Sequence, residues 1–120
     1  MKSAILAMSR GTVVLDENLK DLKSYLQERN IRVFEAPAGF SDSLVAIFAS
    51  GRILVTNNTK DFKIAAAEHE FGIIATEGCT RNAQDLGPAV SKALIENSLW
   101  SQTKPFIFHL STGNLEPLHG

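Results

Sequence analysis

The chain lacks the features that mark disulfide-bonded, membrane-spanning or strongly basic proteins. Its single cysteine, Cys79, cannot form an internal disulfide. The apolar run at residues 4–8 is too short for a signal-peptide core or a membrane span, so we expect a cytoplasmic protein without a membrane partner. The 12 Lys and Arg against 13 Asp and Glu give a net charge of −1, which excludes a strongly basic nucleic-acid footprint.

Nothing in the sequence divides the chain. We find no internal repeat, low-complexity tract or Pro/Gly/Ser-rich linker, and therefore predict a single domain over residues 1–120. A domain of this length buries ~65–70% of its unfolded surface, so it needs neither a metal nor a disulfide to fold. Any bound metal would therefore serve the function of the protein.

Strand and helix patterns alternate along the chain. Runs of apolar and β-branched residues predict strands at 12–15, 31–34, 53–56 and 71–76. Apolar residues at spacings of three and four predict helices at 18–29, 41–50, 59–70 and 88–97. The tail at 105–118 predicts a C-terminal β-hairpin with Pro117 on an edge strand. This alternation predicts an α/β fold with a mostly parallel central sheet and helices on both faces.

Local signals fix several helix ends. Ser41 is a plausible N-cap, and Gly51 would end the same helix as its C′ residue. Thr59 is expected to cap the next helix. Pro88 suits the first turn of the last one, because a proline there gives up no helical hydrogen bond.

Three aspartates are expected at one edge of this sheet. Asp16 directly follows the first strand, although Asp is disfavoured in strands, and Asp42 and Asp61 lie in first turns of helices. Ligands bind at that edge in open α/β sheets, and carboxylates suit hard Mg²⁺ or Mn²⁺ ions that activate water. The helix dipole alone also favours Asp42 and Asp61, so for these two the role of ordinary first-turn acids stays open.

Weaker candidates surround these acids. Glu17 is either a residue that supports a metal or a solvated acid at a helix start. Glu77 follows the fourth strand at the same edge, as a fourth carboxylate or as a loop residue. Lys60 and Arg81 lie in loops near the proposed site and are candidates for phosphate contacts.

Other titratable residues suggest no site. Cys79 lies in a loop without a recognisable histidine partner, which indicates an idle thiol. His69, His109 and His119 lack metal-ligand spacing. Asp85 has no expected place at the edge that carries the aspartates.

Three segments carry a resemblance to a known family. Leu15-Asp16-Glu17-Asn18-Leu19, the helix start Ser41-Asp42, and residues 54–62 (LVTNNTKDF) resemble the PIN-domain ribonucleases, and most closely their short PIN-like branch. Members of that branch are often toxins of toxin–antitoxin pairs. The similarity covers residues 12–76 well and the terminal hairpin loosely.

The resemblance implies a function. It makes Asp16, Asp42 and Asp61 the metal-binding, catalytic acids of an Mg²⁺- or Mn²⁺-dependent endoribonuclease, with Thr56 and Asn58 in support. It implies an RNA substrate, a protein antitoxin and a homo-oligomer. Many members of the short branch carry an acid near the position of Asn58, and larger PIN domains have a further Glu that this chain lacks.

Two alternatives remain open. The first is a PIN-like fold without activity that serves as a binding module. The second is a phosphorylation receiver domain, which shares this length, the early acids and a Lys-Pro pair like Lys104-Pro105. The receiver is disfavoured because Asn57 and Asn58 stand where the acceptor Asp is needed, and because a strand is predicted after Pro105.

Overall fold

The computed structural model describes residues 12–80 and 82–118. The apolar run at 4–8, Arg81 and His119 lie outside this range. Within it, six strands form one sheet in the order β2-β1-β3-β4-β5-β6. Neighbouring strands from β2 to β5 are parallel, and β6 is antiparallel to β5. The predicted α/β fold with a mostly parallel sheet is confirmed.

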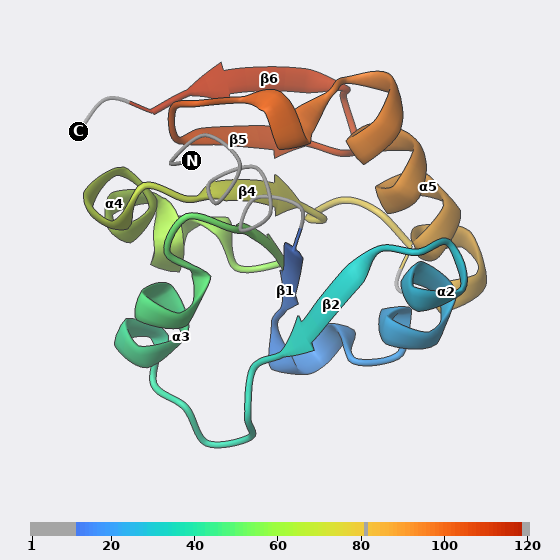
Figure 1. Cartoon of the computed structure of the whole chain (residues 1–120), viewed down its shortest axis with the longest axis horizontal. Coiled ribbons are helices and arrows are strands. Elements are labelled where there is room, and N and C mark those ends of the chain that lie inside the picture. Colours follow the sequence, from blue (N-terminus) through green and yellow to red (C-terminus); the bar gives the residue numbers. More distant parts are fainter. Residues whose placement is uncertain (1–11, 81, 119–120) are drawn as a thin grey trace.

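The strands are short and the helices connect them in alternation (Figure 1). The strands are β1 (Thr12–Leu15), β2 (Arg32–Glu35), β3 (Ile53–Thr56), β4 (Gly72–Ala75), β5 (Phe106–His109) and β6 (Asn114–Pro117). The helices of the described residues are η1 (Glu17–Leu19), α2 (Leu22–Glu28), α3 (Asp42–Ala49), α4 (Thr59–His69), α5 (Ala83–Glu96) and η2 (Leu99–Ser101), of which η1 and η2 are 3₁₀ turns. No described helix has the length and apolar character that a membrane crossing requires.

The strands β1, β3 and β4 are buried on both faces, which is why their side chains are mostly apolar rather than alternating between apolar and polar. In β1, Val13 and Leu15 pack under α2 and α5, whereas Val14 packs under α3 and α4. The strands β3, β4 and β5 divide their side chains in the same way. Figure 1 shows the resulting three layers, with α2 and α5 on one side of the sheet and α3 and α4 on the other.

The connection from β4 through α5 to β5 has the opposite hand to the other parallel connections among the described elements. The chain passes from β1 to β2 by α2 on one face, then back to β3 and on to β4 by α3 and α4 on the other. The connection through α5 moves across the sheet in the same direction as the connection through α4, from β4 to the next strand β5. However, α5 lies on the same face of the sheet as α2. This is unusual, because parallel crossovers overwhelmingly share one hand. It places α5 against α2.

A glycine allows that contact. Gly87 of α5 is buried, and a Cβ there would lie 2.7 Å from ring carbons of Tyr25 in α2. A side chain at this position would hold the two helices apart, so the close approach requires glycine.

Two helix starts differ from the prediction. The expected helix at 18–29 begins only at Leu22, because Asp16 accepts a hydrogen bond from the Glu17 N–H and caps the separate turn η1. The expected helix at 88–97 begins at Ala83, where the Asn82 side chain caps the N–H of Gln84. Pro88 is therefore the sixth residue of α5, not part of its first turn.

Both predicted ends of α3 are confirmed, whereas the predicted cap of α4 is not. The Oγ of Ser41 accepts a hydrogen bond from the Leu44 N–H and caps α3, and Gly51 follows that helix with a φ of +71°. Thr59 does not cap α4. It is the first residue of that helix, and its hydroxyl donates to Glu77 instead.

Candidate functional site

Asp16 lies at the end of β1, where β1 and β3 adjoin and the chain leaves them toward opposite sides of the sheet. Ligands of open α/β sheets bind at such a switch point, outside the carboxyl ends of the strands. We call this side of the sheet the carboxyl edge. It is the edge at which β1 to β5 end, and it carries Asp16, Thr56 and Glu77 at or directly after those ends.

The Asp16 carboxylate is held by two hydrogen bonds. Its Oδ1 accepts from the Glu17 N–H at 2.8 Å, and its Oδ2 accepts from the Thr56 hydroxyl at 2.8 Å. The Thr56 Oγ1 in turn accepts from the Asn58 N–H at 3.0 Å. Thr56 is fully buried and Asp16 is half-buried. A buried hydroxyl therefore fixes the orientation of a carboxylate that still reaches solvent. Of the two supporting residues implied by the resemblance, Thr56 contacts Asp16 directly, and Asn58 contacts Thr56 through its backbone N–H.

Asp42 and Asp61 lie in the first turns of α3 and α4 and are exposed. Both helices start at the carboxyl edge, on the same face of the sheet, and pack against each other. The structure thus brings the three aspartates to one edge. It does not gather their side chains, because no group of three or more His, Cys, Asp or Glu within 12–80 and 82–118 is close enough to hold a metal ion.

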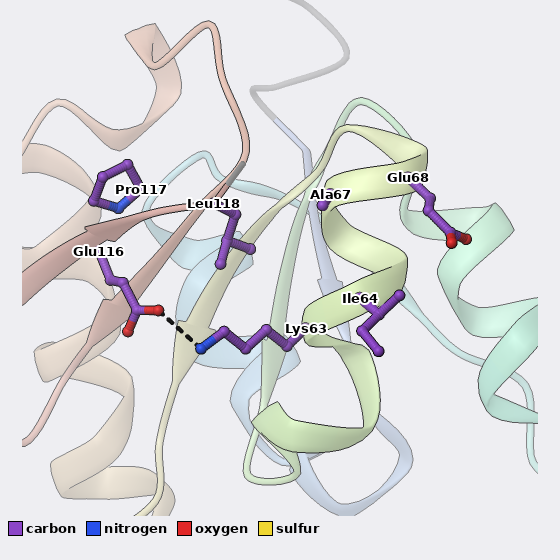
Figure 2. Close-up of a pocket in the computed structure, with 7 residues that line it drawn as sticks. All are labelled: Lys63, Ile64, Ala67, Glu68, Glu116, Pro117 and Leu118. Atoms are coloured by element: carbon purple, nitrogen blue, oxygen red, sulfur yellow. Dashed lines mark ion pairs between the residues drawn. The ribbon is translucent and has the colours of Figure 1, made fainter. Parts of the chain in front are cut away.

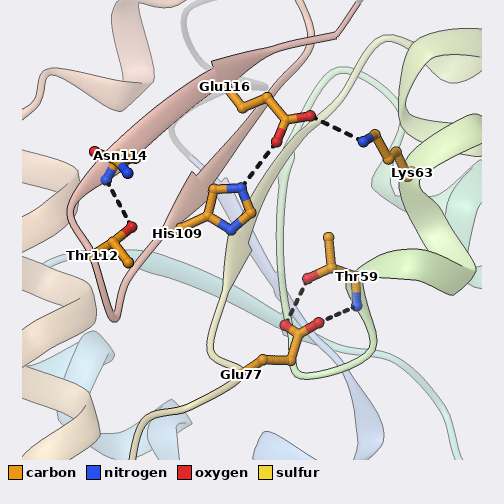
Figure 3. A network of polar contacts seen from close by, with 7 residues as sticks. All are labelled: Thr59, Lys63, Glu77, His109, Thr112, Asn114 and Glu116. Carbon is orange, nitrogen blue, oxygen red and sulfur yellow. Dashed lines mark hydrogen bonds and ion pairs between the residues drawn. The ribbon is translucent and has the colours of Figure 1, made fainter.

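Glu77 is a structural partner of α4. Its Oε2 accepts from the Thr59 N–H at 3.0 Å and its Oε1 accepts from the Thr59 hydroxyl at 2.6 Å, as Figure 3 shows. The carboxylate therefore satisfies the start of α4 in place of the N-cap Asn58, whose side chain makes no cap bond. Glu17 is exposed, and its backbone N–H rather than its carboxylate meets Asp16.

Asp85 lies at the carboxyl edge, although the sequence analysis gave it no place there. It lies in the first turn of α5, which also begins at the carboxyl edge, but α5 covers the opposite face of the sheet from α3 and α4. Asp85 is consequently a poor control for variants of the three aspartates.

A small cavity of about 180 Å³ opens at this edge between the ends of β3 and β4. Its lining residues are Leu19, Asn57, Thr76, Glu77, Gly78, Cys79, Thr80 and Leu86. Burial, and secondarily the charge of Glu77, raise the pKa of Cys79 above its ordinary value. A raised pKa leaves less of the thiol ionised at neutral pH, which lowers its reactivity as a nucleophile.

A larger groove of about 490 Å³ lies between α4 and β6 (Figure 2). It is lined by Lys63, Ile64, Ala67, Glu68, Glu116, Pro117 and Leu118. Its wall is largely apolar and none of the three aspartates contributes to it. The chemistry of the carboxyl edge, not the volume of this groove, therefore defines the candidate site.

Glu116, which lines this groove, forms ion pairs with a helix residue and a residue of the neighbouring strand, and the sequence analysis did not predict them. Glu116 of β6 contacts Lys63 of α4 at 3.0 Å and His109 of β5 at 3.1 Å (Figure 3). These contacts with His109 and Lys63 lower the pKa of Glu116. The pairing of Ile107 with Glu116 makes His109 and Glu116 diagonal neighbours, so the strand register would have revealed the contact. Lys63 is thus engaged away from the aspartates. Lys60 is exposed in the first turn of α4, so the prediction that it lies in a loop is wrong.

Comparison of the chain with models of known families, with curated proteins and with solved structures finds no match. The PIN-like assignment is accordingly a proposal. It depends on the segments at 15–19, 41–42 and 54–62 and on the positions that these segments take in the fold.

Proposed function

We propose that the carboxyl edge is the active site of a PIN-like, metal-dependent endoribonuclease, in a chain whose β5–β6 pair forms the family's C-terminal hairpin. The observation that supports this most strongly is the placement of Asp16. It stands at the switch point between β1 and β3, and the buried Thr56 hydroxyl orients it. A carboxylate held in this way is prepared for chemistry rather than for folding alone.

The residues of the edge have separate tasks in this proposal. Thr56 positions Asp16 and is itself positioned by the Asn58 N–H. Each oxygen of the Asp16 carboxylate keeps a further acceptor site, because an ionised carboxylate offers about four lone-pair positions. Lys60, in the first turn of α4, would attract the phosphate of an RNA backbone.

The donor chemistry suits Mg²⁺ or Mn²⁺, because Asp16, Asp42 and Asp61 supply the oxygen ligands that these ions prefer. A bound ion would activate water and neutralise the leaving oxygen of the phosphodiester. Since the three side chains are not gathered in the described structure, binding requires Asp42 and Asp61 to turn toward Asp16. Both side chains are exposed.

A toxin–antitoxin role follows by analogy from the resemblance. In that setting we expect a cytoplasmic protein that cleaves RNA, assembles as a homo-oligomer and is inhibited by a protein antitoxin. A small open reading frame beside the gene would support this setting.

An inactive PIN-like binding module is the second candidate. The separation of the three acids within the described residues favours it, as does Asn58 at a position where related proteins often carry an acid. The receiver alternative is weakened further, because strand β5 and not a helix follows Lys104-Pro105.

Cleavage and melting measured on the same variants test the proposal. We expect the wild type to cleave a mixed RNA pool in Mn²⁺ and not in EDTA, and millimolar Mn²⁺ to raise its Tm by binding only the folded state. Asp16→Asn and Asp61→Asn should abolish both effects. Glu96→Gln is the matched control, because Glu96 is an exposed acid at the far end of α5.

The outcomes separate the two candidates. Cleavage and a Mn²⁺-dependent Tm that are lost in the Asp variants support the nuclease. A Tm that Mn²⁺ leaves unchanged, together with intact RNA, supports the binding module. If Asp61→Asn costs only the ~0.3–1 kcal/mol of a first-turn acid and cleaves like the wild type, Asp61 is a helix-start residue and not part of a site.

A further inference from the structure

Apolar side chains are concentrated on one surface formed by β2, the loop after it and α3. Among the large apolar residues that the described structure leaves exposed, Phe34, Phe40, Leu44 and Ile47 all lie within this one stretch of chain. Such a patch on a small protein marks a site of association. We call Phe34, Leu44 and Ile47 the β2–α3 patch, because Phe34 packs against α3 and the other two residues lie on that helix.

The outer side of α3 explains the patch. Val45, Ala46 and Ala49 of this helix face the core. Leu44 and Ile47 lie three residues apart and form a second apolar stripe, which no described residue buries. A helix that is apolar on both sides is normally buried on both sides, so the outer side of α3 lacks a partner among the described residues.

The patch is rigid rather than a loose collection of side chains. Phe34 packs edge-on against Phe48 of α3, with ring centroids 5.6 Å apart. The Arg52 guanidinium stacks over both rings at 5.2 and 5.4 Å and also donates to the Phe48 carbonyl. Rings fixed in this way lose little conformational freedom when a partner covers them.

Opposite charges stand at the two ends of the patch. Asp42 lies at the start of α3, at the carboxyl edge, and Arg32 begins β2 at the other edge of the sheet. Arg32 and Phe34 alternate with the core-facing Val33 and therefore point to the face that α3 covers. Within the described residues, neither Arg32 nor Asp42 forms an ion pair.

This distribution of charge is self-complementary. If two copies meet through this surface about a two-fold axis, their α3 helices run antiparallel, and Asp42 of each copy lies against Arg32 of the other. Leu44, Ile47 and Phe34 then fill the centre between these pairs. β2 is the terminal strand of the sheet, so its free edge is available to the same contact (Figure 1).

We infer that the β2–α3 patch is a two-fold homodimer surface, with Leu44 and Ile47 at its centre and reciprocal Asp42–Arg32 pairs at its ends. The inference deepens the homo-oligomer of the proposed function by naming its surface. The proposed metal site also needs Asp42, so the end pairs and the metal compete for this carboxylate, whereas Leu44 and Ile47 take no part in the chemistry at Asp16. A catalytically inactive chain would associate in the same way.

Sedimentation velocity of the full chain over a concentration series tests this surface. We expect the mass of the wild type to rise from 13.1 kDa toward twice that value. Ile47→Lys should weaken the dimer at least about tenfold, as expected for a residue at the centre of an interface. Ile64→Lys on α4 is the matched control, because Ile64 is 75% exposed, compared with 58% for Ile47, and lies outside the patch.

A charge exchange tests the orientation of the two copies. Arg32→Asp and Asp42→Arg should each weaken the dimer, and the double variant should restore it. A wild type that stays monomeric to millimolar concentration overturns the inference, as does a patch that binds only a different protein chain. Equal effects of Ile47→Lys and Ile64→Lys, or a double variant weaker than either single one, also contradict it. Circular dichroism confirms that each variant is folded.

Discussion

Replacing Thr56 with valine isolates the contact that orients Asp16. Valine has nearly the shape of threonine and suits a buried β-strand, so the change removes the hydroxyl without leaving a cavity. Two hydrogen bonds are lost, the one donated to the Asp16 Oδ2 at 2.8 Å and the one accepted from the Asn58 N–H at 3.0 Å. We expect Thr56→Val to lower the free energy of unfolding, and Thr56→Ser, which keeps the hydroxyl, to preserve most of it.

The size of the effect follows from burial. A hydrogen bond to a charged group contributes about 1.5–3 kcal/mol, but water can replace part of it because Asp16 is only half-buried. Asn58 is exposed, so its N–H adds less than about 1 kcal/mol. We therefore expect a loss of about 2 kcal/mol, which corresponds to about 8 °C in Tm for a chain of this length.

Urea unfolding followed by the fluorescence of Trp100, the single tryptophan, measures this loss. A double-mutant cycle with Asp16→Asn then separates the contact from the rest of the site, because Thr56→Val should cost less when the carboxylate charge is absent. The reasoning is refuted if Thr56→Val unfolds at the wild-type urea concentration, or if Thr56→Ser is as unstable as Thr56→Val.

Two further predictions concern other parts of the fold. The lowered pKa of Glu116 means that its contacts stabilise the protein at neutral pH and are lost as the pH falls below 4.5 through the folded-state pKa. Glu116→Gln should therefore flatten the acid side of a plot of the free energy of unfolding against pH, by less than about 1 kcal/mol because the side chain is partly exposed. A plot parallel to that of the wild type contradicts this. Gly72→Ala should destabilise by about 1–3 kcal/mol, because a Cβ there overlaps the buried Phe106 ring. Phe106→Leu in the same chain should make the loss smaller than the sum of the single changes, as measured by urea unfolding, and strict additivity would disprove the overlap.

Local sequence signals were sufficient to predict the strands and both ends of one helix, α3. The run Val13 to Leu15 is apolar without interruption because both faces of β1 are covered. The cap Ser41 and the C′ residue Gly51 delimit α3 by interactions that span only a few residues. Asp16 could be placed at the carboxyl edge for the same reason, since its position depends only on where β1 ends.

Features that depend on distant residues could not be predicted in this way. Pro88 suggested a helix start, but the Asn82 side chain caps α5 earlier, and Pro88 lies inside the helix. Thr59 was expected to cap α4 by itself, but Glu77 arrives from the end of another strand to do so.

The separation of the three aspartate side chains could not be predicted from the sequence either. The sequence gives the element in which each acid lies, but not the rotation of α3 and α4 about their own axes. That rotation is set by the packing of Val45, Phe62 and Ala66 on the sheet, and it directs Asp42 and Asp61 to solvent.

The reversed crossover through α5 also bears on how the chain folds. α2 and α5 are neighbours on one face, yet more than fifty residues separate Glu28 from Ala83. The apolar side of α2 therefore has no complete partner until the last third of the chain is present. Such non-local contacts require long loops to close before any stabilisation is gained, which slows folding. We expect the two ends of the sequence to fold in a single cooperative step, so that a fragment ending before α5 would not fold independently.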